Sequence, residues 1–172
     1  MMKMAGALLI IGTTSLWGIK EASKVKSQLK HMKYLQKIIC LIQSEIRYSK
    51  AYLGEIFWKI GQSVEEPYKS WLLEMSKKAN TFSGESLEDI WKSSVEKRLK
   101  ILELPACELE ALKSLGNQLG YADIQIQVKL LDLYLEHLEH TICEVQEEIK
   151  GKTRLYHCLG LMSGLLISIV LF

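Results

Sequence analysis

The chain has 172 residues, of which 48% are hydrophobic and 24% are charged. This length fits one domain, or one domain with membrane anchors, and the net charge of +2 does not suggest nucleic acid as a partner. The cysteines form no Cys-x-x-Cys pair, so the sequence contains neither a disulfide framework nor a zinc site of recognisable spacing. We interpret all four as reduced, small hydrophobic residues: Cys40, Cys107, Cys143 and Cys158.

The two ends of the chain are apolar and carry no charge, from Met4 to Ile19 and from Leu155 to Phe172. The second stretch has the length of about 18 residues that a spanning helix needs. The first is shorter, but no small-residue cleavage site follows it and Trp17 stands where an interfacial anchor would stand. We predict membrane spans at residues 1–19 and 155–172 around a helical domain of residues 20–154. A cleaved signal peptide is the alternative for the first stretch.

Positive charge flanks both predicted spans on their inner side. Only Lys3 lies beyond the first span, so the positive-inside rule places the middle domain in the cytoplasm. The same cations attract anionic lipid headgroups, and each cation near the membrane surface contributes about 1 kcal/mol to the binding free energy. The flanking residues are Lys20, Lys24, Lys26 and Lys30 after the first span, and Lys150, Lys152 and Arg154 before the second.

Small residues recur every fourth position in the second predicted span, at Gly160, Gly164 and Ser168. This spacing lets two membrane helices approach closely. It predicts contact with the first span, with a second copy of the chain or with another membrane protein. A chance occurrence of this spacing is the alternative, given equal weight, because glycine and serine are frequent in spanning helices.

Between the ends, the apolar pattern predicts helices only. The first helix continues from the first span to about Lys50, followed by short helices over residues 53–62 and 68–78, the latter with Pro67 at its first position. After a loop at residues 80–84, Ser86 and Asp89 form a loose capping box for a helix that ends near Lys100. Pro105 begins a fifth helix that ends near Gly120. The expected fold is an all-α bundle of five to six helices.

Two long apolar stripes are expected to pack against each other. The first runs along the opening helix and the second along the last, with spacings of three and four residues. The first comprises Val25, Leu29, Met32, Leu35, Ile39, Ile42 and Ile46, and the second comprises Val128, Leu131, Leu135, Leu138, Ile142, Val145 and Ile149.

His137 and His140 are the strongest candidates for chemistry, because residues three apart on a helix share a face and could bind one metal ion with Glu136 or Glu144. This gives an alternative function, a metal-binding membrane-associated sensor or enzyme. The chain has no phosphate-binding loop and no nucleophile motif, so we predict no enzyme, no cofactor and no metal. Three carboxylate pairs are expected to be exposed: Glu65 with Glu66, Glu108 with Glu110, and Glu147 with Glu148.

Several weak motifs occur in a fixed order along the whole chain. They are Lys3 and an apolar run into Trp17-Gly-x-x-x-Ala, Gly84-x-Ser-Leu-x-x-x-Trp91, Ser-Leu-Gly-Asn-Gln-Leu-Gly-Tyr-Ala-Asp at 114–123, Gln127, Lys152 and Tyr156-x-x-Leu-Gly-x-x-x-Gly164. Together they resemble the stage III sporulation protein AB family of endospore-forming bacteria.

The resemblance implies a single copy of the cytoplasmic domain of the type II secretion system F platform protein, rather than its two tandem copies. It implies a scaffold in the mother-cell membrane facing the forespore, within the secretion-like complex that links the two cells. The implied partners are the secretion-type ATPase, stage III sporulation protein AA, and other membrane proteins of the same operon. We expect the docking surface among Glu65, Glu66, Lys69 and Lys77, and a homo-oligomer is also compatible with the sequence.

Overall fold

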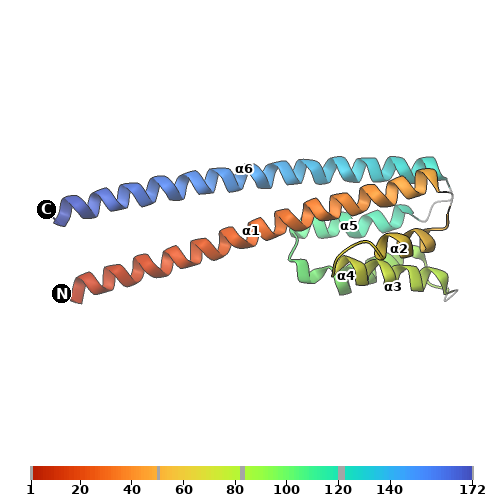
Figure 1. The fold of residues 1–172 in the computed structure, drawn as a ribbon, viewed down its shortest axis with the longest axis horizontal. Helices are drawn as coiled ribbons and strands as arrows, with labels where there is room; N and C mark the ends of the chain where they lie inside the picture. Colours follow the sequence, from red (N-terminus) through yellow and green to blue (C-terminus); the bar gives the residue numbers. More distant parts are fainter. Residues whose placement is uncertain (1, 50, 82–83, 120–122, 172) are drawn as a thin grey trace. The chain divides into compact units, whose positions relative to one another are not determined.

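The computed structural model describes the backbone of residues 2–49, 51–81, 84–119 and 123–171, and the side chains of residues 23–49, 51–81, 84–117, 119 and 123–151. This part of the chain consists of six α-helices and one 3-10 turn, without a strand (Figure 1), which confirms the all-α prediction. Among these residues, no helix is both long and apolar enough to cross a membrane. The predicted spans at 1–19 and 155–172 fall on side chains outside the described ones, so they stay predictions.

The helices form two compact units. Unit 1 contains the beginning of α1 and the end of α6, as residues Met1–Leu29 and Ile142–Phe172. Unit 2, called the central bundle below, is Lys30–Thr141 and contains every short helix. The elements are α1 Met2–Tyr48, α2 Leu53–Gly61, α3 Tyr68–Asn80, α4 Leu87–Arg98, η1 Lys100–Leu102, α5 Ala106–Leu119 and α6 Ile124–Leu171.

The helix boundaries follow local chemistry that the sequence already contained. Ser86 is the N-cap of α4, and its hydroxyl oxygen accepts a hydrogen bond from the Asp89 backbone N–H at 3.1 Å, as predicted. The reciprocal contact joins the Ser86 hydroxyl to the Asp89 carboxylate at 2.7 Å. Pro67 precedes α3 as its N-cap and is not its first residue, a shift of one position from the prediction. Glu103 ends the 3-10 turn in the left-handed region, with φ of 49°.

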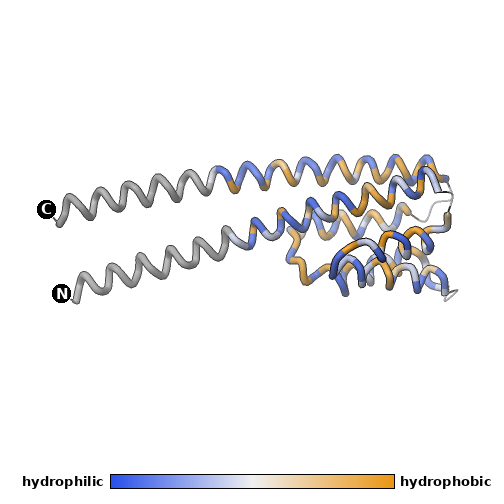
Figure 2. The backbone as a smooth tube through the Cα atoms, viewed as in Figure 1, coloured by the Kyte–Doolittle hydropathy of each residue, from blue (hydrophilic) through white to orange (hydrophobic). Residues whose placement is uncertain are grey.

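The core of the central bundle is built on the predicted stripe of α1 and on large aromatic side chains of the short helices. Met32, Leu35, Ile39, Ile42 and Ile46 are all buried, and in Figure 2 apolar positions recur along this part of α1. Three aromatic contacts complete this core. The ring centroids of Trp71 and Trp91 are 5.0 Å apart, those of Phe57 and Trp91 are 6.1 Å apart, and those of Tyr34 and Tyr68 are 5.1 Å apart. Burial of this apolar surface, about 25 cal/mol per Å², is the main stabilising contribution.

Helix α6 packs on two neighbours, and its buried face is wider than the predicted stripe. Leu131 and Leu138 are fully buried as expected, and Gln43 of α1 donates to the Val128 carbonyl at 3.1 Å. Gln127, Tyr134 and Thr141 are buried as well, so the buried face extends to the positions just before Val128, Leu135 and Ile142 of the predicted stripe. The reason is α5, which contacts α6 on this side through a hydrogen bond from Gln127 to the Leu119 carbonyl at 2.9 Å.

Candidate functional site

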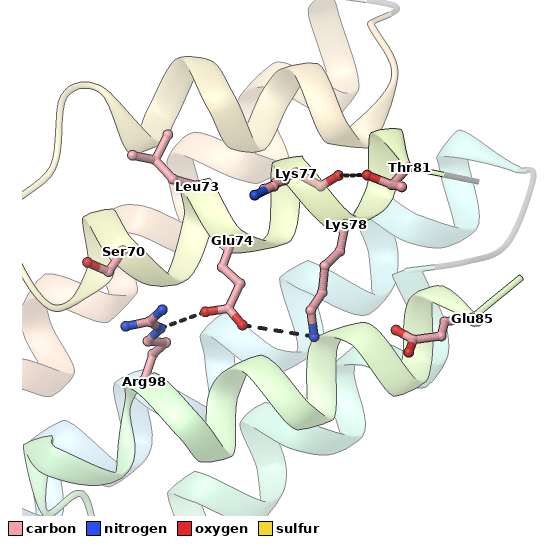
Figure 3. A pocket seen from close by; sticks show the side chains of 8 residues that line it. All are labelled: Ser70, Leu73, Glu74, Lys77, Lys78, Thr81, Glu85 and Arg98. Carbon is pink, nitrogen blue, oxygen red and sulfur yellow. Dashed lines mark hydrogen bonds and ion pairs between the residues drawn. The ribbon is translucent and has the colours of Figure 1, made fainter. Parts of the chain in front are cut away.

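A groove of about 650 Å³ lies between α3 and α4. Figure 3 shows that Glu74 and Lys78 extend from α3 toward α4, while Arg98 extends from the end of α4 toward Glu74. The lining combines charged groups with two hydroxyls and one apolar side chain. It comprises Ser70, Leu73, Glu74, Lys77, Lys78, Thr81, Glu85 and Arg98.

Glu74 is the inner carboxylate of this groove, and its side chain is only 14% exposed. Arg98 Nε donates to it at 2.6 Å, Lys97 Nζ lies at 3.4 Å and Lys78 Nζ at 3.9 Å. Burial on its own would raise the pKa of Glu74, but the hydrogen bonds from Arg98 and Lys97 outweigh it and hold this pKa below its ordinary value. Glu74 is therefore ionised at neutral pH and has three cations around it.

The cations at the rim of the groove come from the C-terminal ends of two helices. Lys77 and Lys78 stand in the last turn of α3, and Lys97 and Arg98 in the last turn of α4, where cations complement the negative end of the helix dipole. Near the start of α3, the Glu66 carboxylate accepts from the Ser70 hydroxyl at 2.6 Å and from the Ser70 backbone N–H at 3.1 Å. These bonds, the first in particular, lower the pKa of Glu66.

A second polar cluster lies between α5 and α6, around the fully buried Glu108. The Tyr134 hydroxyl donates to Glu108 Oε1 at 2.7 Å, and His137 Nε2 lies 3.6 Å from Oε2. Among the described residues, no group forms a hydrogen bond with Oε2. Burial and then the neighbouring Glu108 carboxylate raise the pKa of Tyr134 well above its ordinary value, so Tyr134 stays a neutral donor.

The residues around His137 do not assemble a metal site in the described part of the chain. No three His, Cys, Asp or Glu side chains lie close enough there to hold one ion together. The structure brings His137 to Glu108 of α5, a partner that the sequence pattern did not indicate. The metal-binding alternative therefore has no ligand set among these residues.

Comparison with known proteins shows to which family the chain is related. The family model described as stage III sporulation protein AB matches residues 3–172. The chain belongs to the stage III sporulation protein AB family. Stage III sporulation protein AB of Bacillus subtilis (strain 168) is 26% identical over 171 residues, which covers 99% of each chain. A solved structure of stage III sporulation protein AB (SpoIIIAB) has the same fold, with a TM-score of 0.66 and 24% identity over 72% of this chain and 97% of that chain.

Within this family member, the predicted partner-binding residues lie on or beside α3. Glu65, Glu66 and Lys77 are exposed and Lys69 is half-buried. Lys77 lines the groove, whereas the other three do not. The Glu65 backbone N–H donates to the Tyr34 hydroxyl at 3.0 Å, which ties the approach to α3 to α1.

The predicted membrane-related residues fall largely outside the described side chains. Lys24, Lys26, Lys30 and Lys150 are exposed, as cations in contact with headgroups would need to be. The side chains of Lys20, Lys152 and Arg154 lie outside the described residues, and so do those of Gly160, Gly164 and Ser168. The roles of both sets stay predictions.

Two predictions about side-chain environment were wrong. Glu108 was expected on an exposed face but is fully buried, because it continues the apolar stripe of Leu112, Leu115 and Leu119 at helical spacing. That spacing was a usable signal for its burial. The cysteines were interpreted as reduced, small hydrophobic residues; Cys40, Cys107 and Cys143 are free thiols as expected, but they are exposed and take no part in the apolar core. The side chain of Cys158 lies outside the described residues. Glu74 and Arg98 were missed, since their proximity depends on how α3 packs against α4.

Proposed function

We propose that the chain is a non-enzymatic membrane platform protein of the secretion-like complex that links mother cell and forespore during endospore formation. It docks a cytoplasmic secretion-type ATPase, stage III sporulation protein AA, on its helical domain. The observation that carries the proposal is the family match from residue 3 to residue 172, which includes both apolar ends as well as the central bundle. The protein would lie in the mother-cell membrane with two spans and a cytoplasmic middle.

The chemistry of the central bundle supports a scaffold. Its interior contains packed aromatic and aliphatic side chains, and Glu74 of its groove pairs with Lys78, Lys97 and Arg98. A platform needs a stable helical surface with charged groups that a partner can recognise, and α3 and α4 provide one. The resemblance to the cytoplasmic domain of the type II secretion system F platform protein supports the same proposal, with one copy of that domain in place of two tandem ones.

The sidedness of the central bundle tests the proposal directly. We would keep Cys107 as the only thiol by replacing Cys40, Cys143 and Cys158 with serine, produce the chain in non-sporulating cells whose membrane faces the medium, and treat the intact cells with an impermeant maleimide. Cys107 is exposed, whereas partial burial raises the pKa of Cys40 and makes that thiol a slower reporter. Protection of Cys107 until lysis is expected. Labelling in intact cells would place the bundle on the other side of the membrane and refute ATPase docking.

Association within the membrane is tested separately. The predicted packing face changes shape in Gly164→Leu, because a large side chain prevents close helix approach. We expect this variant to lose copurification with a second copy of the chain or with membrane proteins of the same operon. Ser163→Leu, one position away on the helix, is the control. Unchanged association of Gly164→Leu would remove this face from the proposal.

A further inference from the structure

The groove between α3 and α4 carries more positive charge than its inner carboxylate neutralises. Glu74 is shared by Lys78, Lys97 and Arg98, and three positive charges against one negative charge leave this cluster with a net charge of +2. Lys77 adds a further exposed cation to the lining. Glu85 lines the end near the start of α4 and contributes one negative charge.

The arrangement leaves hydrogen-bond donors directed outward. Arg98 uses Nε for Glu74, and its side chain is 40% exposed. Among the described residues, no acceptor is bonded to its terminal Nη groups. A guanidinium has five N–H donors, and its terminal pair matches the two oxygens of a carboxylate. Lys97 is 65% exposed at the same end of the groove and can join such a contact.

We propose that the groove between α3 and α4 docks an acidic segment of the ATPase partner, with carboxylates of that segment paired to Arg98, Lys97 and Lys77. The inference rests on the proposed function, from which it takes the partner, and it specifies where that partner binds and by which chemistry. The groove's volume of about 650 Å³ lies within the range of small-molecule pockets, about 300 to 1,000 Å³, so it can take up only a short part of the segment. Leu73 provides an apolar wall for the non-acidic residues of the segment.

The carboxylates within the groove favour a ligand whose acidic side chains are spaced apart over a ligand with closely spaced negative charges. Glu74 and Glu85 lie within the lining, and Glu66 lies close enough to Arg98 for their charges to interact. A row of closely spaced phosphates would meet these anions and be repelled. A protein segment can place one carboxylate at Arg98 and another at Lys77, and leave neutral residues beside Glu74. Complementary charges of this kind select the partner and its orientation.

The test measures the affinity of the purified ATPase for the full chain in nanodiscs of neutral phosphatidylcholine, by biolayer interferometry. Lys77→Glu should weaken binding about fivefold, since it replaces an attraction by a repulsion at a solvent-exposed pair. Glu74→Gln removes the groove's own negative charge and should tighten binding about threefold. Both effects should shrink in high salt. A folding defect cannot produce the second result, because damage to the surface would not raise affinity.

Lys92→Glu is the matched control, because it makes the same charge change on the neighbouring helix α4, outside the groove. Lys92 is 45% exposed, pairs with Glu88 at 2.7 Å and does not line the groove, so its variant should bind as the wild type does. If Lys77→Glu and Glu74→Gln behave like Lys92→Glu while the wild type binds, the groove is not the docking site and the proposed function stands. Absence of binding by the wild type overturns the proposed function and this assignment together. A dependence on these residues seen only in phosphatidylglycerol nanodiscs would assign the groove to lipid headgroups and overturn the inference.

Discussion

Gly116 of α5 lies directly against the side chain of Trp91 of α4 in the central bundle. A Cβ added at Gly116 would lie 2.5 Å from Cγ and 2.7 Å from Cβ of Trp91, and it would also meet Cδ1. Real Cβ atoms essentially never approach another atom within 3.0 Å. The indole cannot move aside freely, because its Nε1–H donates to the Leu112 carbonyl at 2.7 Å and its ring packs on Trp71 at 5.0 Å. Gly116→Ala should therefore destabilise the bundle.

The size of the effect follows from three contributions. Overpacking a tight core site costs about 1–3 kcal/mol. Displacing Trp91 also weakens its buried hydrogen bond, which contributes about 1 kcal/mol. Alanine recovers about 1 kcal/mol through its higher helix propensity. We expect a net loss of about 2 kcal/mol in the free energy of unfolding.

The same substitution elsewhere in the chain has the opposite expected sign. A Cβ at Gly151 of α6 would meet nothing within 4 Å, so Gly151→Ala gains helix propensity without a clash. Thermal unfolding of the full chain, followed by circular dichroism and tryptophan fluorescence, compares the two. For a chain of this length a change of 1 kcal/mol shifts Tm by about 2–4 °C, so Gly116→Ala should lower Tm by about 4–8 °C and Gly151→Ala should raise it by about 2 °C. A Gly116→Ala variant at least as stable as the wild type would show that α4 and α5 do not make this contact.

Three further predictions use the same unfolding assay. Tyr134→Phe should cost about 1–3 kcal/mol, because it removes the hydrogen bond to Oε1 of the buried Glu108 and leaves that atom without a donor. Adding Glu108→Leu should recover most of this loss, and a double variant no more stable than the single one would contradict the prediction. Ser86→Ala should cost about 1 kcal/mol through loss of the α4 N-cap, and Ser86→Thr, which keeps the hydroxyl for Asp89, should retain most of the stability; no loss in the alanine variant would refute the cap. Arg98→Gln should be less stable than the wild type at pH 7, and the difference should vanish in acid. Folding lowers the pKa of Glu74, so the ionised carboxylate stabilises the folded state above the unfolded-state pKa. This stabilisation is lost as the pH falls through the folded-state pKa. A stability difference between Arg98→Gln and the wild type that persisted in acid would exclude the Glu74–Arg98 pair as the source of the difference.

Much of the fold could be predicted from the sequence because the helices carry their own signals. Apolar spacing of three and four residues identified α1 and α6, and the cap at Ser86 fixed the start of α4 to the residue. Pro67 marked the beginning of α3 to within one position. These are local effects of backbone geometry and capping, so they do not depend on how the helices pack against each other.

The groove could not be predicted in this way, because its chemistry joins residues from two helices. Glu74 and Arg98 are 24 positions apart, and neither stands out in the sequence. The cations of the last turns of α3 and α4 were visible as ordinary helix-end residues. Only the packing of α3 against α4 brings Lys97 and Arg98 to the carboxylate of Glu74 and makes a positively charged surface of them.

Glu108 shows how a correct general expectation gives a wrong local prediction. A charged side chain is expected outside because its burial costs several kcal/mol unless a partner compensates. Glu108 nevertheless stands at helical spacing before Leu112, Leu115 and Leu119, so α5 cannot bury those leucines without burying Glu108 as well. The compensation comes from the Tyr134 hydroxyl, 26 positions away on α6. The burial of Glu108 is therefore determined by its position on the buried face of α5 and not by its residue type. Tyr134, which compensates for this burial, can be recognised as its partner only when the contact between α5 and α6 is known.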